Sequence, residues 1–327
     1  MHNSENILEL QNIVKIFRRG IILGQKIFAV NNVSFKMPKE PEILTIAGES
    51  GCGKTTLAKI ILHIIEPTSG RILLNGRDMT KVRGKERYQL IKLVQPVFQN
   101  PYETFNPLKR IDTYLYDTAK LIKENDKHRN IDEVIEESLN SVGLSFQEVK
   151  GKYPHEFSGG QLQRISLARS LILNPLLLVA DEPISMLDVS LRVSILNLFK
   201  ELKNTKKLSI IYITHDLSTA YYVSNRIAIM FRGSFVELGN IDDVLNSPLH
   251  PYTSLLRKSI LKPVVSKDEI TNKKIEITPT VDEAIEFAER GCKFSLRCPN
   301  VMEKCKNQDP PIFFVNDREV KCWLYAN

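Results

Sequence analysis

The feature that most constrains this chain is a glycine-rich segment between an apolar run and an amphipathic run. Residues 48–56 read G-E-S-G-C-G-K-T-T and directly follow the apolar residues 43–47. Glycines let a backbone fold around an anion with its N–H groups pointing inward, and a helix that follows adds the positive end of its dipole. Strand, loop and helix in this order predict a phosphate-binding loop in an α/β sheet, in preference to an ordinary turn.

Two side chains of this loop carry specific expectations. We expect Lys54 to contact the β and γ phosphates of a nucleoside triphosphate, and Thr55 to offer its hydroxyl to Mg²⁺. After the loop, apolar residues recur at helical spacing as far as Ile65, which predicts a helix packed on a sheet. The nucleotide contacts expected from the loop are Gly48, Glu49, Ser50, Gly51, Cys52, Gly53, Lys54, Thr55 and Thr56.

Length and composition limit the alternatives. The 327 residues exceed the usual size of a single core, about 250 residues, so we expect one large domain with an appendage. No apolar run exceeds five residues, far below the roughly 20 needed to cross a bilayer. We therefore expect no transmembrane segment and, since the first residues do not resemble a secretion signal, a cytoplasmic protein. The net charge of +7 is dispersed along the chain, which predicts no nucleic-acid partner.

An acidic pair follows a second apolar run. Residues 176–180 are apolar at every position, as expected for a strand buried on both faces of a parallel sheet, and the run ends in Asp181 and Glu182. Open α/β sheets bind ligands at the carboxyl ends of their strands. We expect Asp181 to hold the Mg²⁺ shell and Glu182 to orient and deprotonate an attacking water.

A second anion site is predicted at the start of another helix. Ser158, Gly159, Gly160 and Gln161 precede a helical apolar pattern, so the serine and two glycine N–H groups would lie at a helix N-terminus. A chain that binds one nucleotide needs only one phosphate-binding segment of its own. We therefore expect this segment to contact the γ phosphate of a nucleotide held by a partner subunit.

Together these motifs resemble the ATP-binding subunits of ABC transporters over residues 7–260. In this resemblance residues 48–55 are the Walker A motif, 157–161 the ABC signature and 176–182 the Walker B motif. The implied fold is α/β, with a RecA-like P-loop core, an antiparallel β subdomain, a helical signature subdomain and a cysteine-rich C-terminal tail. The β subdomain is predicted by the alternation of apolar residues at Val33, Phe35 and Met37 and by residues 70–74. A helix of the signature subdomain is predicted at residues 131–139.

The resemblance also assigns residues one by one. Gln99 looks like the Q-loop glutamine of the Mg²⁺ and water shell, and Asp188 like the D-loop aspartate at the dimer interface. His215, after the β-branched run 210–214, resembles the switch histidine at the γ phosphate. Phe17 resembles the aromatic residue that stacks on adenine, with Phe28 as the alternative.

Two further segments indicate a branch of the family. Residues 98–107 look like the extended Q-loop of dipeptide and oligopeptide importers, and residues 250–253 resemble their C-terminal signature. Pro101-Tyr102 looks more like the F-type than the D-type of the two ATPase subunits. This implies an ABC ATPase domain over residues 1–250, with its helical subdomain at about 100–172, and an oligopeptide-transporter extension over residues 251–327.

The implied activity is ATP hydrolysis that drives import of peptides or similar solutes across the cytoplasmic membrane. The implied partners are a second, nonidentical ATP-binding subunit, two transmembrane permease subunits and an extracytoplasmic solute-binding protein, with this chain peripheral on the cytoplasmic face. The alternative is a soluble ABC ATPase of the repair or translation type. The 58 residues between Gln99 and Ser158 show no sustained heptads, unlike repair-type members, and the chain has one cassette, unlike most translation-type members.

The C-terminal residues contain four cysteines after the polar stretch 266–276, which reads as a linker. Clustered cysteines in a cytosolic protein favour metal ligands over disulfides, and the spacing alone leaves zinc, an iron–sulfur cluster and free thiols open. The tail resembles the one that ligates a 4Fe–4S cluster in peptide-importer ATPases, which makes that cluster the expectation and zinc the alternative. The implied ligands are Cys292, Cys298, Cys305 and Cys322.

Overall fold

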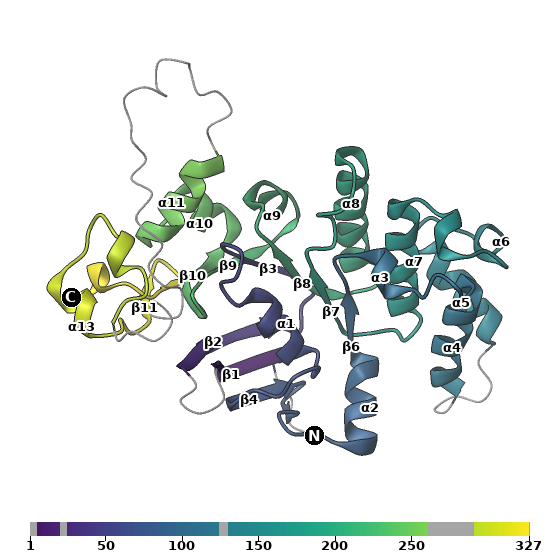
Figure 1. Cartoon of the computed structure of the whole chain (residues 1–327), viewed down its shortest axis with the longest axis horizontal. Helices are drawn as coiled ribbons and strands as arrows, with labels where there is room; N and C mark the ends of the chain where they lie inside the picture. The colour runs from purple at the N-terminus through teal and green to yellow at the C-terminus, as the bar shows by residue number, and fades with distance from the viewer. Residues whose placement is uncertain (1–4, 20–24, 124–129, 261–290, 327) are drawn as a thin grey trace, which may run out of the picture.

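Two β-sheets form the frame of the described chain, which comprises residues 5–19, 25–123, 130–260 and 291–326 of this computed structural model (Figure 1). The larger sheet has eight strands in the order β11-β12-β10-β9-β3-β8-β7-β6, and the smaller has four in the order β2-β1-β4-β5. The expected linker at 266–276 lies outside the described residues. The strands are β1 (Asn6–Arg19), β2 (Gln25–Pro38), β3 (Ile43–Ala47), β4 (Ser69–Leu74), β5 (Arg77–Asp78), β6 (Val94–Val97), β7 (Leu177–Asp181), β8 (Ser209–Thr214), β9 (Arg226–Phe231), β10 (Ser234–Asn240), β11 (Phe313–Val315) and β12 (Arg318–Val320).

Five neighbouring strands of the larger sheet, from β9 to β6, run parallel. Every residue of β3 and β8 is buried, because both faces of the sheet are covered. The apolar runs at 43–47, 176–180 and 210–214 are the strands β3, β7 and β8, within one residue of their predicted ends. These strands bring the segments that follow them to one edge of the sheet.

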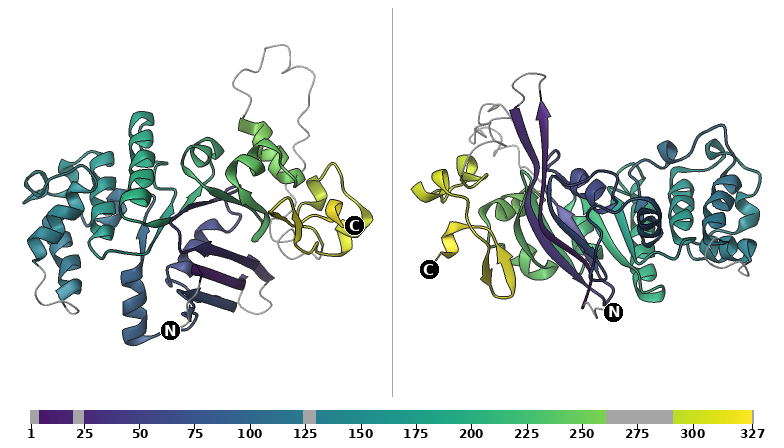
Figure 2. Two further views of the ribbon diagram at one scale, coloured as in Figure 1. Left: turned by 180° about the vertical axis from the view of Figure 1, so that it is seen from behind. Right: turned by 90° about the horizontal axis from the view of Figure 1, so that it is seen from below.

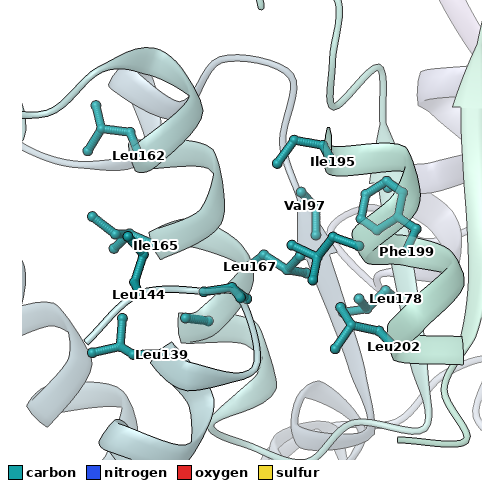
Figure 3. Close-up of a cluster of buried hydrophobic side chains, with 14 of the residues drawn as sticks. Val97, Leu139, Leu144, Leu162, Ile165, Leu167, Leu178, Ile195, Phe199 and Leu202 are labelled. Atoms are coloured by element: carbon teal, nitrogen blue, oxygen red, sulfur yellow. The ribbon is translucent and has the colours of Figure 1, made fainter. Parts of the chain in front are cut away.

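Successive side chains of a central strand face two different apolar clusters, as the period of two in a strand requires. On β7, Leu177 and Val179 belong to the cluster that contains the buried side of α1, whereas Leu178 and Ala180 belong to the cluster of α7 and α8. Figure 3 shows Leu178 near Leu202 of α8 in the second cluster. Helix α7 therefore packs on the face of the sheet opposite α1.

The helices of the described residues are α1 (Lys54–Ile61), α2 (Gly84–Leu93), α3 (Pro101–Thr104), α4 (Ile111–Lys123), α5 (Ile131–Asn140), α6 (Phe146–Val149), α7 (Gly159–Leu171), α8 (Val189–Thr205), α9 (Leu217–Val223), α10 (Ile241–Asn246), α11 (Pro251–Ile260) and α13 (Glu303–Asn307). The helix predicted near 131–139 is α5. Helix α1 ends before Ile64 and Ile65, where helical spacing predicts further turns. His63 takes the left-handed conformation (φ 53°) and the N–H of Ile64 bonds back to the Lys59 carbonyl, a pairing that terminates helices.

The smaller sheet is antiparallel, as the alternation of residues 33–37 predicts. Val33, Phe35 and Met37 on β2 are buried and join the same cluster as α1, so the sheet covers that helix (Figure 2). Within this sheet, β1 pairs antiparallel with β2 on one side and with β4 on the other. The phosphate loop and its helix thus lie between the two sheets.

The C-terminal residues add two strands to the edge of the larger sheet. Strand β12 pairs antiparallel with β10, with Glu237 opposite Val320, and β11 pairs with β12. Arg318 is buried and donates hydrogen bonds to the carbonyls of Asp243 (2.9 Å) and Ser247 (2.6 Å). These two bonds to backbone carbonyls tie residues 291–326 to the main body.

Candidate functional site

The phosphate loop runs from the end of β3 to the start of α1 and is shaped by its glycines. Gly51 and Gly53 have φ of 78° and 110°, in the left-handed region that favours glycine. A Cβ on Gly53 would lie 2.1 Å from the Ala29 carbonyl oxygen of β2, whereas a Cβ on Gly51 would meet no atom within 4 Å. The loop is therefore packed on one side and open on the other, as a cradle for an anion must be.

Lys54 places a buried positive charge inside this loop. Its Nζ donates hydrogen bonds to the carbonyl oxygens of Gly48 (2.8 Å) and Glu49 (2.9 Å), and the side chain is only 6% exposed. The ammonium has three donors, so it can exchange these carbonyls for phosphate oxygens without leaving the loop. A polyphosphate fits this charge and this open cradle.

Asp181, at the end of β7, reaches the start of α1. The Thr55 side chain hydrogen-bonds its carboxyl group, while burial raises the pKa of Asp181 above its usual value. The buried Oδ1 atom has no hydrogen-bond partner among the described residues. A buried carboxylate oxygen with a free lone pair beside a threonine hydroxyl suits a hard divalent cation, so these residues fit Mg²⁺.

Glu182 is held by side chains that follow two other strands of the parallel sheet. Its Oε2 accepts a hydrogen bond from Gln99 Nε2 (3.3 Å), after β6, and its Oε1 lies 2.9 Å from His215 Nδ1, after β8. Ser185 Oγ accepts a second bond from Gln99 (3.2 Å). The three residues that the sequence assigned to catalysis therefore meet at the carboxyl ends of neighbouring strands, beside Asp181.

The signature segment forms the N-terminus of α7. Ser158 Oγ accepts from the Gln161 N–H (3.3 Å), and Gln161 Oε1 accepts from the Ser158 N–H (3.0 Å), a reciprocal capping box. A Cβ on Gly160 would come within 2.9 Å of the Leu191 side chain of α8, and Asp188 is the N-cap residue of that helix. The predicted signature and D-loop residues are thus neighbours, on the face of the sheet opposite α1.

The two candidates for adenine stacking lie on neighbouring strands of the smaller sheet. Phe17 on β1 is 43% exposed, with Lys15 Nζ 5.3 Å from its ring centroid. Phe28 on β2 is half-buried and lies opposite Ile16. An exposed ring is free to stack on a base, so Phe17 remains the preferred prediction.

Sequence reasoning missed two residues that contact the phosphate loop. The Glu49 N–H donates to Tyr252 Oη (3.0 Å), and the Glu49 carboxylate accepts two hydrogen bonds from Arg297 (3.0 and 2.9 Å). These partners are 203 and 248 residues away in the chain. No local pattern could have indicated the contacts, and only the opposite charges of Glu49 and Arg297 were visible in the sequence.

The predicted 4Fe–4S cluster is wrong, and the zinc alternative has no support either. All four tail cysteines are free, and the described residues contain no group of three or more His, Cys, Asp or Glu side chains that could hold a metal ion. Cys292 and Cys298 instead pack against the apolar cluster around Phe231 and Phe294. Burial raises the pKa of Cys292 to about 11, which favours the neutral thiol, so this cysteine behaves as a small apolar side chain.

None of the helices in the described part of the chain is long and apolar enough to cross a membrane.

Two family models match the sequence: one described as ABC transporter over residues 30–185, and one described as oligopeptide/dipeptide transporter, C-terminal region, over residues 236–305. Both motif-based resemblances therefore have independent support.

Similar proteins extend over nearly the whole chain. The oligopeptide transport ATP-binding protein AppF of Bacillus subtilis is 38% identical, covering 99% of each chain. The di/tripeptide transport ATP-binding protein DppF of Pseudomonas aeruginosa is 36% identical, covering 97% of each. Among solved structures, the ATP-binding cassette MJ0796, dimeric in a post-hydrolysis state with ADP and Pi, aligns with a TM-score of 0.62 and 25% identity over 72% of this chain and 98% of that one.

Proposed function

This chain belongs to the ATP-binding subunits of oligopeptide and dipeptide ABC transporters, and on that premise we propose that it hydrolyses ATP to drive import of peptides or similar solutes across the cytoplasmic membrane. The observation that carries the proposal is the carboxylate of Glu182, held by Gln99 and His215 beside the buried Asp181. A soluble repair or translation ATPase is not favoured, because the peptide-transporter C-terminal model also matches.

The nucleotide site is proposed from the loop upward. The backbone N–H groups of the loop and the N-terminus of α1 bind the phosphates, and Lys54 contacts the β and γ phosphates. The residues that would hold Mg²⁺ are Thr55, Asp181 and Gln99. When bound, the ion supplies neutralising charge to the phosphate oxygens. Phe17 stacks on the adenine.

Glu182 acts as the general base in this proposal. Its carboxylate accepts a proton from the attacking water, and the hydrogen bond from Gln99 fixes where that carboxylate points. The contact between Glu182 and His215 Nδ1 orients the imidazole, with Nδ1 as the donor to the carboxylate. When Nε2 also carries a proton, it can donate to the γ phosphate. Positioning and charge, with no covalent intermediate, carry most of the rate in phosphoryl transfer.

A complete site needs a second subunit. Helix α7 packs on the face of the sheet opposite α1, so the segment Ser158–Gln161 is available to a nucleotide on a partner chain, with Asp188 at the same interface. We propose a nonidentical partner ATPase, because the resemblance to dipeptide and oligopeptide importers implies two different ATPase subunits.

The remaining partners follow from the family. We propose two transmembrane permease subunits, which contact the surface around Phe98 and Tyr102, and an extracytoplasmic solute-binding protein. Both aromatic side chains are substantially exposed, 41% and 50%. This arrangement makes the chain a peripheral protein of the cytoplasmic membrane face. We assign the ATPase domain to residues 1–250, with its helical subdomain near 100–172, and the extension to residues 251–327.

The test uses the chain reconstituted with its permease subunits in vesicles, with the solute-binding protein added. We expect wild type to couple ATP hydrolysis to peptide uptake, and Lys54→Ala to bind ATP weakly because a phosphate charge partner is lost. Lys39→Ala, at an exposed lysine directly after β2, is the matched control and should behave as wild type. Wild-type nucleotide affinity in Lys54→Ala would contradict the role given to Lys54. Hydrolysis without peptide uptake would contradict the transport function.

A further inference from the structure

We propose that Arg297 is a positioning residue for ATP binding: through Glu49, residues 291–326 hold the phosphate loop in the conformation that accepts nucleotide. This inference rests on the proposed function, because it concerns the same ATP site. Its starting point is the contact of Arg297 with Glu49, a pair that joins the last part of the chain to the phosphate loop.

The contact between Arg297 and Glu49 is a bidentate ion pair. Arg297 donates from both terminal nitrogens, to Glu49 Oε2 (3.0 Å) and to Oε1 (2.9 Å). Two parallel bonds fix the orientation of a carboxylate as well as its distance, which a single bond cannot do. The two side chains are about a third exposed, 31% and 40%, so solvent screens the pair in part and its effect should be moderate.

The arginine is itself held in place. Its guanidinium lies over the rings of Phe231 and Phe294, 5.8 and 5.7 Å from their centroids, and such cation–π contacts restrict a long side chain. The Arg297 N–H also bonds to the Phe294 carbonyl (3.0 Å). Phe294 is 2% exposed and packs edge-on against Phe231. The Arg297 guanidinium is therefore held by a buried aromatic cluster, unlike an arginine side chain that extends freely into solvent.

The same cluster contacts the backbone of Glu49. Tyr252, fully buried against Phe231 (4.4 Å between centroids), accepts a hydrogen bond from the Glu49 N–H. Arg297 holds the side chain of the same residue. Tyr252 and Arg297, which both lie outside the loop, thus hold the main chain and the carboxylate of Glu49.

The contact between Arg297 and Glu49 affects ATP binding in two ways. First, the carbonyl oxygen of Glu49 accepts a hydrogen bond from Lys54 Nζ (2.9 Å), so a fixed Glu49 keeps the ammonium inside the loop until phosphate oxygens replace that carbonyl. Second, a carboxylate in a phosphate loop repels a polyphosphate, and Arg297 neutralises that charge. Loss of Arg297 should therefore weaken ATP binding, while Glu182 and the hydrolysis step stay unaffected.

The experiment measures ATP affinity and steady-state hydrolysis for the full chain in its transporter. Arg297→Gln should raise the Kd and KM for ATP about three- to tenfold, the range of a partly screened, bidentate charge pair, with kcat within about twofold of wild type. Adding Glu49→Gln should bring the Kd back toward wild type, because no unpaired carboxylate remains. Lys306→Ala removes an exposed ion pair of the same tail, with Glu303, and should change nothing.

A second readout separates positioning from mere folding. ATP should slow hydrogen exchange in residues 291–326 of wild type, and this protection should disappear in Arg297→Gln, because coupling between two sites is reciprocal. If Arg297→Gln does not fold, Arg297→Lys replaces it, since lysine keeps the charge but loses the bidentate contact and should give an intermediate Kd. A wild-type Kd in the folded variants would overturn the inference and leave the proposed function intact. Failure of wild type to bind ATP would overturn the proposed function itself.

Discussion

Glu182 adopts a backbone conformation that a glutamate seldom takes. Its φ is 46°, in the left-handed region, directly after β7. The surrounding contacts over-determine that conformation: the Glu182 N–H bonds to the Ile213 carbonyl (2.9 Å), and its own carbonyl accepts from the N–H and Oγ of Ser185 (3.2 and 3.0 Å). Strained residues of this kind persist where the geometry of a side chain matters. Here the strain aims the carboxylate at Gln99 and His215.

At this position Glu182→Gln should abolish turnover and keep nucleotide binding. Glutamine has the same shape and can still bond to its neighbours, but it cannot take a proton from water, so the rate should fall about 10²- to 10⁴-fold. Phosphate release and nucleotide affinity measured on the same preparation check this. Glu201→Gln, an exposed position on α8, serves as the control. Hydrolysis at the wild-type rate in Glu182→Gln would remove Glu182 from the role of base.

His250 is a second residue whose surroundings determine its chemistry. It is 1% exposed, its Nδ1 accepts the Tyr252 N–H (3.0 Å), and burial lowers its pKa to about 3. In the unfolded chain a histidine titrates near pH 6.5. Below about pH 6 the unfolded state therefore binds a proton that the folded state does not, and stability falls as the pH falls.

This difference predicts a pH dependence that a substitution removes. Between pH 6 and 4 the free energy of unfolding should decrease by about 1.4 kcal/mol per pH unit through His250 alone. His250→Asn keeps an acceptor for the Tyr252 N–H without titrating, so its stability should depend less steeply on pH by that amount. Urea unfolding of both proteins across this range measures the difference. Burial also lowers the pKa of His63, to about 4, but that effect is common to both proteins and cancels. Parallel pH profiles would show that His250 is not responsible.

Among the elements, α8 shows how the helices depend on the sheet. Its buried side includes Phe199, which is 0% exposed, lies near Tyr212 of β8 (6.2 Å between ring centroids) and is drawn in Figure 3. Its N-terminus, at Asp188, carries the D-loop and packs against the signature segment. The packing of one helix thus positions two of the predicted interface motifs.

Truncation of that contact should destabilise the chain strongly. Phe199→Ala leaves a cavity in the cluster and should lower the free energy of unfolding by about 3–5 kcal/mol. Val193→Ala, at a 47% exposed position of the same helix, should change it by less than about 0.5 kcal/mol. Denaturant titration of the two variants makes the comparison. Equal effects would mean that α8 does not depend on this buried face.

At the scale of the whole molecule, the two predicted anion sites belong to different faces of one sheet. Helix α1 and the smaller sheet cover one face, and α7 with α8 covers the other. We therefore expect Ser158 to contact a nucleotide held by a partner subunit and not the chain's own. The two sites of the assembled transporter should therefore respond separately to a change in this chain.

Ser158→Arg tests that separation in the assembled transporter. The bulky cation should block closure on the partner's nucleotide, so vanadate-trapped photoaffinity label should be lost from the partner ATPase. Label on this chain, whose own phosphate loop is untouched, should persist. Ser145→Arg, at the half-buried N-cap of α6, is the control at another helix start with a capping box. Loss of label from this chain alone would indicate that the signature acts on its own nucleotide.

Features that depend on residues close together in the chain were predicted correctly, and features that depend on distant contacts were not. The phosphate loop, the three buried strands and the capped start of α7 were all predicted, because each depends on glycine conformation, side-chain period or capping within a few residues. The metal cluster was predicted wrongly, because cysteine spacing does not determine whether the thiols form a ligand set, and in the folded chain Cys292 and Cys298 pack against the aromatic cluster.

The sequence by itself determined the branch of the family and predicted the nucleotide-binding segments, because both depend on contiguous residues. Tertiary structure decided the geometry in which these segments meet, and it alone showed that Tyr252 and Arg297 contact the phosphate loop. It brought Gln99, Glu182 and His215 together at one edge of the sheet, and it placed Arg297 on Glu49, 248 residues away. The physical reason is that burial of the two faces of a sheet and of an aromatic cluster selects such contacts, and burial is a property of the folded chain as a whole.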